Sequence, residues 1–337
     1  MTTERISLDH GSGGKMAHRL TAELLLPLFD NPILADLHDG AVLTLADGNR
    51  VAFSTDTFTV TPLFFPGGDI GELAVNGTVN DVAMCGAKPL FISLALIIEE
   101  GFPMAELTRI LHSIHRASQK AAVNVVTGDT KVVPKGAADG LFINTSGIGI
   151  IPDHVTIGST GARPGDKIIL SGTMADHGMT ILTQREGLTF ESTIESDSAP
   201  LNHMVQSILA ASGNVHVLRD PTRGGVGTTL NEIAESSRAG IVLQESWLPV
   251  RSAVAGVCEL LGFDPLYVAN EGKLLAFVAA EDVDAVLEAI RSDVFGRNAC
   301  IIGEVTAEHP GQVVMETRIG GRRIVDMLTG EQLPRIC

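Results

Sequence analysis

The feature that most constrains the fold is the alternation of strand-like and helix-like segments along the chain. Residues 103–121 carry apolar side chains at helical spacing, and Pro103 suits a first helical turn. A second helix is expected over residues 70–86. The strands expected around these helices are Arg50–Thr57, Phe91–Ile98, Asn124–Asp129 and Leu141–Ile150. This order predicts an α/β (α+β) fold class.

A turn-rich stretch, residues 152–165, separates a second α/β series from the first. The second series begins with a strand at Lys167–Ser171. It continues with helices at Ala199–Ala211, Val226–Arg238 and Asp282–Arg291 and strands at Leu274–Ala279 and Ala299–Val305. A chain of 337 residues is long enough for two domains. We therefore expect domains at residues 1–155 and 156–328 and a flexible tail at residues 329–337.

The charge balance narrows the classes of partner. Lys and Arg number 24 against 40 Asp and Glu, a net charge of −16, and no basic cluster is present. Nucleic acid and anionic membranes are therefore not expected as partners. The start is polar and no apolar run reaches the roughly 18 residues that span a bilayer. We expect a cytoplasmic protein, which could still bind nucleotide through Mg²⁺.

Four cysteines are widely spaced, without a CxxC pair, so neither a zinc site nor a redox dithiol is expected. Cys85, Cys258 and Cys300 lie among apolar residues and are predicted to be buried and inert. Cys337 is the last residue printed. On an extended tail it could visit both an internal site and a partner, as a covalent carrier does. A frayed end that finishes in cysteine is the equal alternative.

Residues 10–15, His-Gly-Ser-Gly-Gly-Lys, are glycine-rich, but Met16 replaces the Ser or Thr of a P-loop. A flexible N-terminal loop is the simpler interpretation. The functional alternative is a cradle of backbone N–H groups in which Lys15 contacts phosphate.

Four aspartates, Asp56, Asp81, Asp129 and Asp220, follow strands, sit on a helix face or precede a helix N-terminus. Taken singly, each is typical of a cap or turn. Together they offer hard oxygen ligands for Mg²⁺ that carries nucleotide phosphates. Glu271 interrupts an apolar stretch. It could be a base of raised pKa, although its spacing alone favours a solvated turn.

Seven motifs together resemble the HypE family of hydrogenase-maturation factors over essentially the whole chain. They are residues 10–15, Ser54-Thr55-Asp56, Asn80-Asp81-Val82-Ala83, residues 128–133 (Gly-Asp-Thr-Lys-Val-Val), residues 219–225 (Arg-Asp-Pro-Thr-Arg-Gly-Gly), Asn270-Glu271-Gly272-Lys273 and Pro334-Arg335-Ile336-Cys337. The family belongs with aminoimidazole ribonucleotide synthetase and selenophosphate synthetase, ATP-using two-domain proteins.

The resemblance implies an N-terminal domain that dimerises through its strands, an α+β C-terminal domain, and ATP with Mg²⁺ in a cleft near the dimer interface. It implies that the carbamoyltransferase HypF loads a carbamoyl group onto Cys337. The S-carboxamide is then dehydrated to an S-cyanide (a thiocyanate) at the expense of ATP. The cyanide passes to iron on the HypC–HypD complex, as part of the [NiFe]-hydrogenase centre.

The resemblance also assigns roles to residues. Cys337 would be the attachment point, Glu271 the base and Lys131 a charge-neutralising group, with Lys131 or His10 as the alternative base. Mg²⁺ would be held by Asp56, Asp81, Asp129 and Asp220. The nucleotide would be bound by Lys15, Gly13, Gly14, Asp56, Asn80, Asp81, Gly128, Asp129, Thr130, Asp220, Thr222, Arg223, Gly224 and Gly225.

Two rival functions are considered. A selenophosphate synthetase typically carries Cys or selenocysteine in its N-terminal glycine loop, where this chain has none between Gly11 and Gly14. A nucleotide-gated carrier would present the carbamoyl thiol without turning over ATP.

Overall fold

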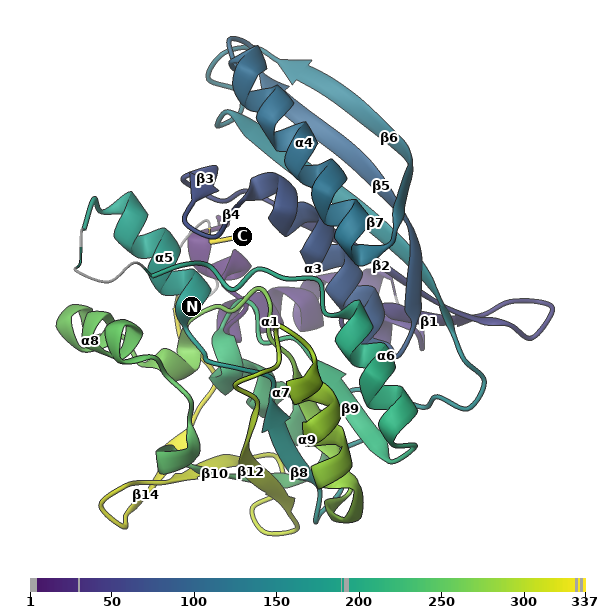
Figure 1. Ribbon diagram of the computed structural model, residues 1–337, viewed down its shortest axis with the longest axis vertical. Coiled ribbons are helices and arrows are strands. Elements are labelled where there is room, and N and C mark those ends of the chain that lie inside the picture. The colour runs from purple at the N-terminus through teal and green to yellow at the C-terminus, as the bar shows by residue number, and fades with distance from the viewer. Residues whose placement is uncertain (1–4, 30, 189, 191–193, 331–332, 334–335) are drawn as a thin grey trace.

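The computed structural model describes residues 5–29, 31–188, 190, 194–330, 333, 336 and 337. A five-stranded sheet of order β1-β2-β7-β5-β6 forms the first half, and a mixed seven-stranded sheet of order β14-β13-β10-β12-β8-β11-β9 forms the second. Figure 1 shows the two sheets at opposite ends of the molecule with helices between them. No helix of the described residues is long and apolar enough to cross a membrane.

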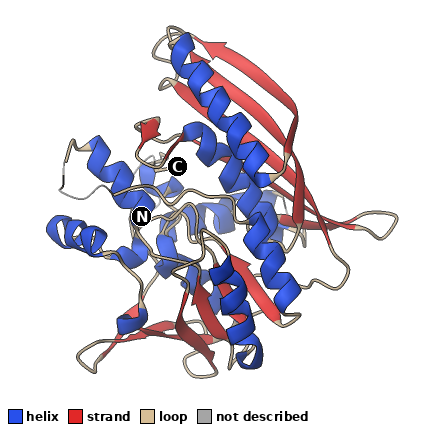
Figure 2. Ribbon diagram, viewed as in Figure 1, coloured by secondary structure: helices blue, strands red, loops and turns tan. Residues whose placement is uncertain are grey.

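The first sheet is covered by helices on one face only, as Figure 2 shows. Its strands are β1 (Ala41–Thr44), β2 (Arg50–Phe58), β5 (Lys88–Glu99), β6 (Asn124–Val133) and β7 (Leu141–Ile151), and the covering helices are α3 (Ile70–Met84) and α4 (Met104–Ala121). A short hairpin, β3 (Phe64–Phe65) and β4 (Gly68–Asp69), leads into α3. The uncovered face carries exposed apolar side chains, among them Phe53, Phe91, Val126, Ile97 and Ile150.

Helix α3 lies at the centre of the molecule. Asp69 caps its start, because its carboxylate accepts the N–H groups of Gly71 (2.8 Å) and Glu72 (3.1 Å). Almost all of its residues are buried, as expected for a helix with neighbours on every side. Helix α4 is amphipathic instead and buries one face that includes Ile110 and Ile114. Pro103 is its N-cap and does not lie within its first turn.

Helices cover both faces of the second sheet. Its strands are β8 (Lys167–Leu170), β9 (Val215–Arg219), β10 (Gly240–Gln244), β11 (Leu275–Val278), β12 (Cys300–Thr306), β13 (Val313–Glu316) and β14 (Arg322–Val325). The alternating side chains of β11 enter two different cores, Ala276 on the side of α6 (Asn202–Ala211) and α9 (Val283–Ser292), Phe277 on the side of α7 (Gly225–Ser237). A strand buried on both faces has a continuous apolar sequence, and this is why the sequence predicts a strand at residues 274–279.

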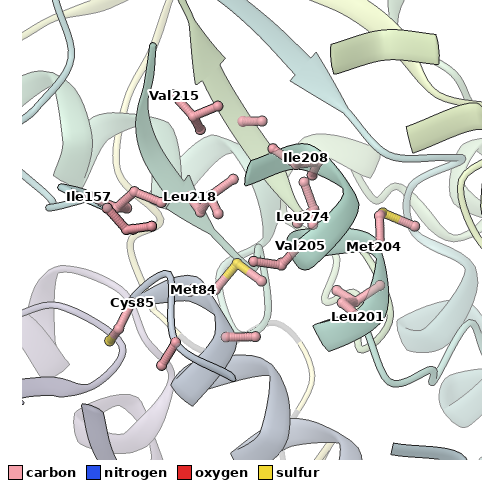
Figure 3. Packing of buried hydrophobic residues seen from close by; sticks show 14 of the residues in the cluster. Met84, Cys85, Ile157, Leu201, Met204, Val205, Ile208, Val215, Leu218 and Leu274 are labelled. Atoms are coloured by element: carbon pink, nitrogen blue, oxygen red, sulfur yellow. The ribbon is translucent and has the colours of Figure 1, made fainter. Parts of the chain in front are cut away.

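One apolar core joins the two halves. Figure 3 shows Met84, at the end of α3, beside Val205 of α6, and Leu201, Met204 and Ile208 continue the same cluster. The same cluster includes Leu218 of β9 and Leu274. The halves are therefore packed against each other through well-buried side chains.

The expected helices and strands are present, but several bounds differ: β5 begins three residues before the expected Phe91, and β6 runs four residues beyond the expected Asp129. The helix expected from Ala199 begins at Asn202. Pro200 explains the difference, because the residue before a proline is pushed away from helical geometry. Two helices were not expected, α5 (Asp176–Arg185) and α8 (Ser252–Leu261), nor were the strands β1, β9, β10, β13 and β14.

Candidate active site

The end of the chain lies inside the molecule, near β3 and β4 in Figure 1. Ile336 is 4% exposed and Cys337 is 8% exposed. Thr59, just after β2, donates its backbone N–H to the Cys337 carbonyl at 3.0 Å. His177, in α5, lies 2.7 Å from the Ile336 carbonyl through Nε2. The last two residues are thus held by both halves of the protein.

A cavity of about 210 Å³ adjoins Cys337. Its wall includes Ser12 from the glycine-rich segment, Thr59, Arg223 and Tyr267. It is therefore a small, mixed polar and apolar space that opens onto the terminal residue. Such a space suits a small polar group carried on the cysteine.

Four carboxylates surround this end of the chain, each from a different element. Asp56 lies on β2, Asp81 on α3, Asp220 directly after β9 and Glu271 in the turn before β11. Burial is the main reason why the pKa of each lies above its ordinary range. Asp56 and Asp220 also raise the pKa of Glu271 by charge repulsion. The negative charges are therefore close together and short of compensation.

Arg223 is the cation nearest to this group. Its guanidinium lowers the pKa of Asp56, Glu271 and the Cys337 thiol. Its own pKa is raised, first by the charge at Cys337 and then, against the effect of burial, by Asp56 and Glu271. Arg223 therefore links the terminal residue electrostatically to the carboxylates.

The pKa of the Cys337 thiol is raised, and burial is the principal cause. Glu271 and Asp56 raise it further, while Arg223 acts in the opposite direction. A protonated thiol is a poor nucleophile. The docked cysteine is therefore not activated for attack at this position.

Asp39, two residues before β1, also belongs with these carboxylates, although it was not predicted from the sequence. The Ser54 hydroxyl lies 3.0 Å from the Asp39 carbonyl and 2.7 Å from Asp81 Oδ2. Burial raises the pKa of Asp39 to about 6, although Arg219 pairs with it at 2.7 Å. An Asp-Gly pair before a strand was the available signal, and it reads as a turn.

The segment around Glu271 is rigidly held, so the solvated-turn interpretation is wrong. Glu271 is 4% exposed and its N–H donates to Asp197 Oδ1 at 3.0 Å. A Cβ on Gly272 would lie 1.8 Å from the Asp197 carbonyl oxygen, so only glycine fits there. Lys273 pairs with Asp197 at 3.1 Å.

The glycine-rich segment is packed rather than free, which corrects the flexible-loop interpretation. A Cβ on Gly13 would lie 2.9 Å from the Arg223 carbonyl oxygen, and one on Gly14 would lie 2.4 Å from that of Leu328. The Lys15 N–H donates to Leu328 O at 2.9 Å at the start of α1 (Lys15–Leu20). The Lys15 side chain is half exposed and pairs with Asp326 at 2.7 Å.

Asn80 was expected to contact metal or nucleotide, but its amide is already used. Its Oδ1 accepts the Leu201 N–H at 2.8 Å and its Nδ2 donates to the Ala199 carbonyl at 3.0 Å. Asn80 therefore ties α3 to the segment before α6. Gly224 and Gly225 both adopt positive φ at the start of α7, and Thr222 closes the turn by accepting the Gly225 N–H.

Gly128, Asp129, Thr130 and Lys131 lie apart from this site, on β6. Asp129 and Lys131 are mostly exposed and pair with each other at 2.7 Å. The pKa of Asp129 is lowered, chiefly by its hydrogen bond to Lys131. Within the described residues, no three His, Cys, Asp or Glu side chains stand close enough to hold a metal ion.

Two family models cover most of the chain. Residues 37–151 match the N-terminal domain of AIR synthase related proteins, and residues 163–316 match the C-terminal domain. The chain is 54% identical over 333 residues to carbamoyl dehydratase HypE of Cupriavidus necator, covering 99% of this chain and 95% of that protein. It is 46% identical to the protein of the same name from Escherichia coli K12, covering 98% and 99%.

Solved structures agree with these relatives. A structure of the hydrogenase maturation protein HypE in complex with ATP aligns with a TM-score of 0.84 at 52% identity, covering 99% of this chain and all of that one. A chain from a HypE–HypF complex aligns with a TM-score of 0.87 at 46% identity, covering 92% and 99%. A ThiL structure with AMPPCP and TMP, at 19% identity and a TM-score of 0.70, shares the fold alone.

Proposed function

We propose, since this chain belongs to the HypE family of carbamoyl dehydratases, that Cys337 carries the group it dehydrates. The chain is an ATP-dependent carbamoyl dehydratase that serves hydrogenase maturation. The observation that supports Cys337 is its position, docked beside a small cavity and four carboxylates. A thiol with a raised pKa fits a carrier of an attached group better than a nucleophile.

Dehydration of an S-carboxamide, –S–CO–NH₂, breaks the C–O bond and removes both N–H protons to leave –S–C≡N. The chain must supply an acceptor for a proton. Glu271 is the candidate, because burial and its neighbours raise its pKa toward the range of a useful base. Its Oε1 accepts no hydrogen bond from the part of the protein that the structure describes. That oxygen is therefore available to a proton on the carboxamide nitrogen.

The described carboxylates do not form a metal site by themselves, but they offer hard oxygen donors to Mg²⁺ whose other ligands are the phosphate oxygens of ATP. Asp56, Asp81 and Asp220 would hold the ion, with Asp39 as a fourth oxygen donor that carries a buried Oδ2 without a hydrogen bond among the described residues. When bound, ATP supplies the phosphoryl group that makes the carboxamide oxygen a leaving group. Arg223 and the backbone N–H groups at Gly13, Gly14, Gly224 and Gly225 would bind and orient phosphate oxygens. Thr222 would orient that turn.

A second copy of the chain would complete the site. Strand β6 is the exposed edge of the first sheet, and the uncovered face beside it is apolar. Such an edge and face call for a covering partner. We propose a homodimer through this sheet, in which Asp129, Thr130 and Lys131, with Gly128, reach the nucleotide of the other copy. In this arrangement β6 serves the partner's site, which would explain why its residues lie apart from the carboxylates of their own chain.

The carbamoyl group would come from HypF, and a HypF complex is known for a protein that is similar over 92% of this chain. Loading requires the Cys337 thiol outside, because it is buried when docked. The cyanide would then pass to iron on a HypC–HypD complex, which again requires an exposed tail.

The test is to weigh the C-terminal peptide after incubation with HypF, carbamoyl phosphate and ATP. We expect a carbamoyl adduct and then a cyanide adduct on Cys337, and neither in Cys337→Ala. Cys258→Ala is the matched control, because Cys258 is buried in another cluster and should leave both adducts intact. Carbamoyl on any other cysteine of the wild-type chain would refute the assignment.

A further inference from the structure

His177 is a buried histidine that the mechanism above does not use. It lies in α5, and its side chain is fully buried. Three groups fix the ring. Ser196 Oγ lies 2.8 Å from Nδ1, the Ile336 carbonyl lies 2.7 Å from Nε2, and Phe65 packs edge-on with ring centroids 5.7 Å apart. A histidine held on all sides and aimed at the chain end suggests a specific task.

The partners of the ring determine which nitrogen carries the proton. The Ile336 carbonyl can only accept a hydrogen bond, so Nε2, 2.7 Å away, carries the hydrogen. In a neutral ring Nδ1 is then the acceptor, and the Ser196 hydroxyl donates to it while its Oγ accepts the N–H of Ser198 at 3.2 Å. Burial lowers the pKa of His177, which agrees with a neutral ring. The Ser196 backbone N–H is held in turn by the Pro66 carbonyl at 2.9 Å.

We infer that His177 is a positioning residue, a latch that holds the tail in its docked state by donating Nε2–H to the Ile336 carbonyl. This inference rests on the proposed role of Cys337 for its meaning in the reaction. Thr59 acts beside it on the Cys337 carbonyl. Both residues bind main-chain oxygen atoms, so the latch grips the tail whatever the sulfur carries. A thiol, a carboxamide and a cyanide would all be placed in the same position.

The latch should have opposite effects on the two halves of the reaction. Dehydration needs the tail inside, whereas loading by HypF needs it outside. A weaker latch should therefore slow the first and leave the second unchanged or faster. A residue that merely stabilised the fold would not separate the two in this way.

The first experiment measures alkylation of the free chain by iodoacetamide, followed by the mass of each cysteine peptide. His177→Ala should raise the Cys337 rate roughly tenfold, the change that corresponds to about 1.4 kcal/mol. Cys85 and Cys258, each 1% exposed, report general unfolding in the same sample and should stay slow. His177→Gln keeps an N–H donor near the Nε2 position and should stay close to wild type.

Two further variants test whether the effect on Cys337 alkylation is specific to His177. His216→Ala removes a histidine of the same half that pairs with Asp166 at 2.8 Å, and should not change Cys337 alkylation. Ser196→Ala keeps the His177 ring but frees its tautomer, and should give a smaller rise, roughly threefold. It also serves if His177→Ala does not fold. An unchanged Cys337 rate in both variants, or a rise in step with Cys85, would overturn the latch.

The second experiment follows carbamoyl loading and single-turnover cyanide formation on the same variants. We expect normal loading and roughly tenfold slower dehydration in His177→Ala. Faster alkylation without slower dehydration would support the latch and contradict the proposed docked site of reaction.

Discussion

Carboxyl groups in two regions of this protein occupy opposite environments. The tail pocket, Asp56, Asp81, Asp220, Glu271 and Arg223 around Cys337, has carboxyl groups whose pKa is raised mainly by burial. On exposed β6, Lys131 lowers the pKa of Asp129 instead. The pocket therefore has four carboxyl groups against one arginine and calls for a further cation, whereas Asp129 on β6 is already paired with Lys131. One chain holds an unfinished site and, elsewhere, residues that could finish the site of another chain.

The largest expected effect tests the pocket as a place of proton transfer. Glu271→Gln should slow cyanide formation by about 10²–10⁴, the usual cost of losing a general base. Carbamoyl should still reach Cys337 and accumulate there. Single-turnover assays on pre-carbamoylated protein, with the C-terminal peptide weighed over time, measure this. A wild-type rate would move the role of base to Lys131 or His10.

The next prediction asks whether pocket and β6 cooperate between chains. Asp81→Asn and Asp129→Asn should each lower ATP turnover by at least about 100-fold. After the two variants are mixed and allowed to exchange subunits, half of the dimers are mixed and each has one intact site. Turnover should recover to roughly a quarter of wild type if Asp129 serves the partner's site. A mixture as inactive as its components would place Asp129 in its own chain's site or outside the reaction.

A smaller effect concerns the stability of the chain without Mg²⁺ or ATP. The pKa of Asp39 is about 6 in the folded state, above its value in the unfolded chain. The contribution of this carboxyl to the free energy of unfolding is therefore fully present at low pH and is lost as pH rises through about 6. Asp39→Asn should therefore be more stable than wild type at pH 8, by roughly 1 to 3 kcal/mol, and lose that advantage near pH 4. Urea unfolding at both values measures it. Asp129→Asn, whose wild-type carboxyl has a lowered pKa, should show no such gain; an equal gain would remove the contrast between the two regions.

The sequence predicted the architecture well because periodicity records burial. Residues 70–84 and 104–121 form helices where expected, and β11 stands out because both its faces are buried. The edge strand β14 and its neighbour β13 were missed because strands of four residues are too short to show a clear alternation of apolar and polar side chains.

The site was predicted less completely, because assembly in three dimensions decides which carboxylates meet. Asp56, Asp81, Asp220 and Glu271 gather around Cys337, but Asp129 carries a similar motif and lies on an exposed strand. Thr59 and His177 were missed because they bind main-chain oxygen atoms of the tail, and no residue pattern marks such contacts. Asn80 was assigned to the ligand because its spacing could not show the partners that occupy its amide.

The anchoring of Leu328 by the glycine-rich segment sets the rules by which a substrate on Cys337 behaves. Seven residues lie between Leu328 and Ile336, so the eight chain steps that join them span roughly 28 Å at most. A group attached to Cys337 by so short a linker has an effective concentration in the millimolar range at the site of its own chain, whatever the protein concentration. The dehydration step is then intramolecular, so it does not saturate with substrate and dilution of the protein does not slow it. Only the encounters with separate proteins depend on concentration, and each of those proteins must come within that distance of Leu328 to reach the group on Cys337.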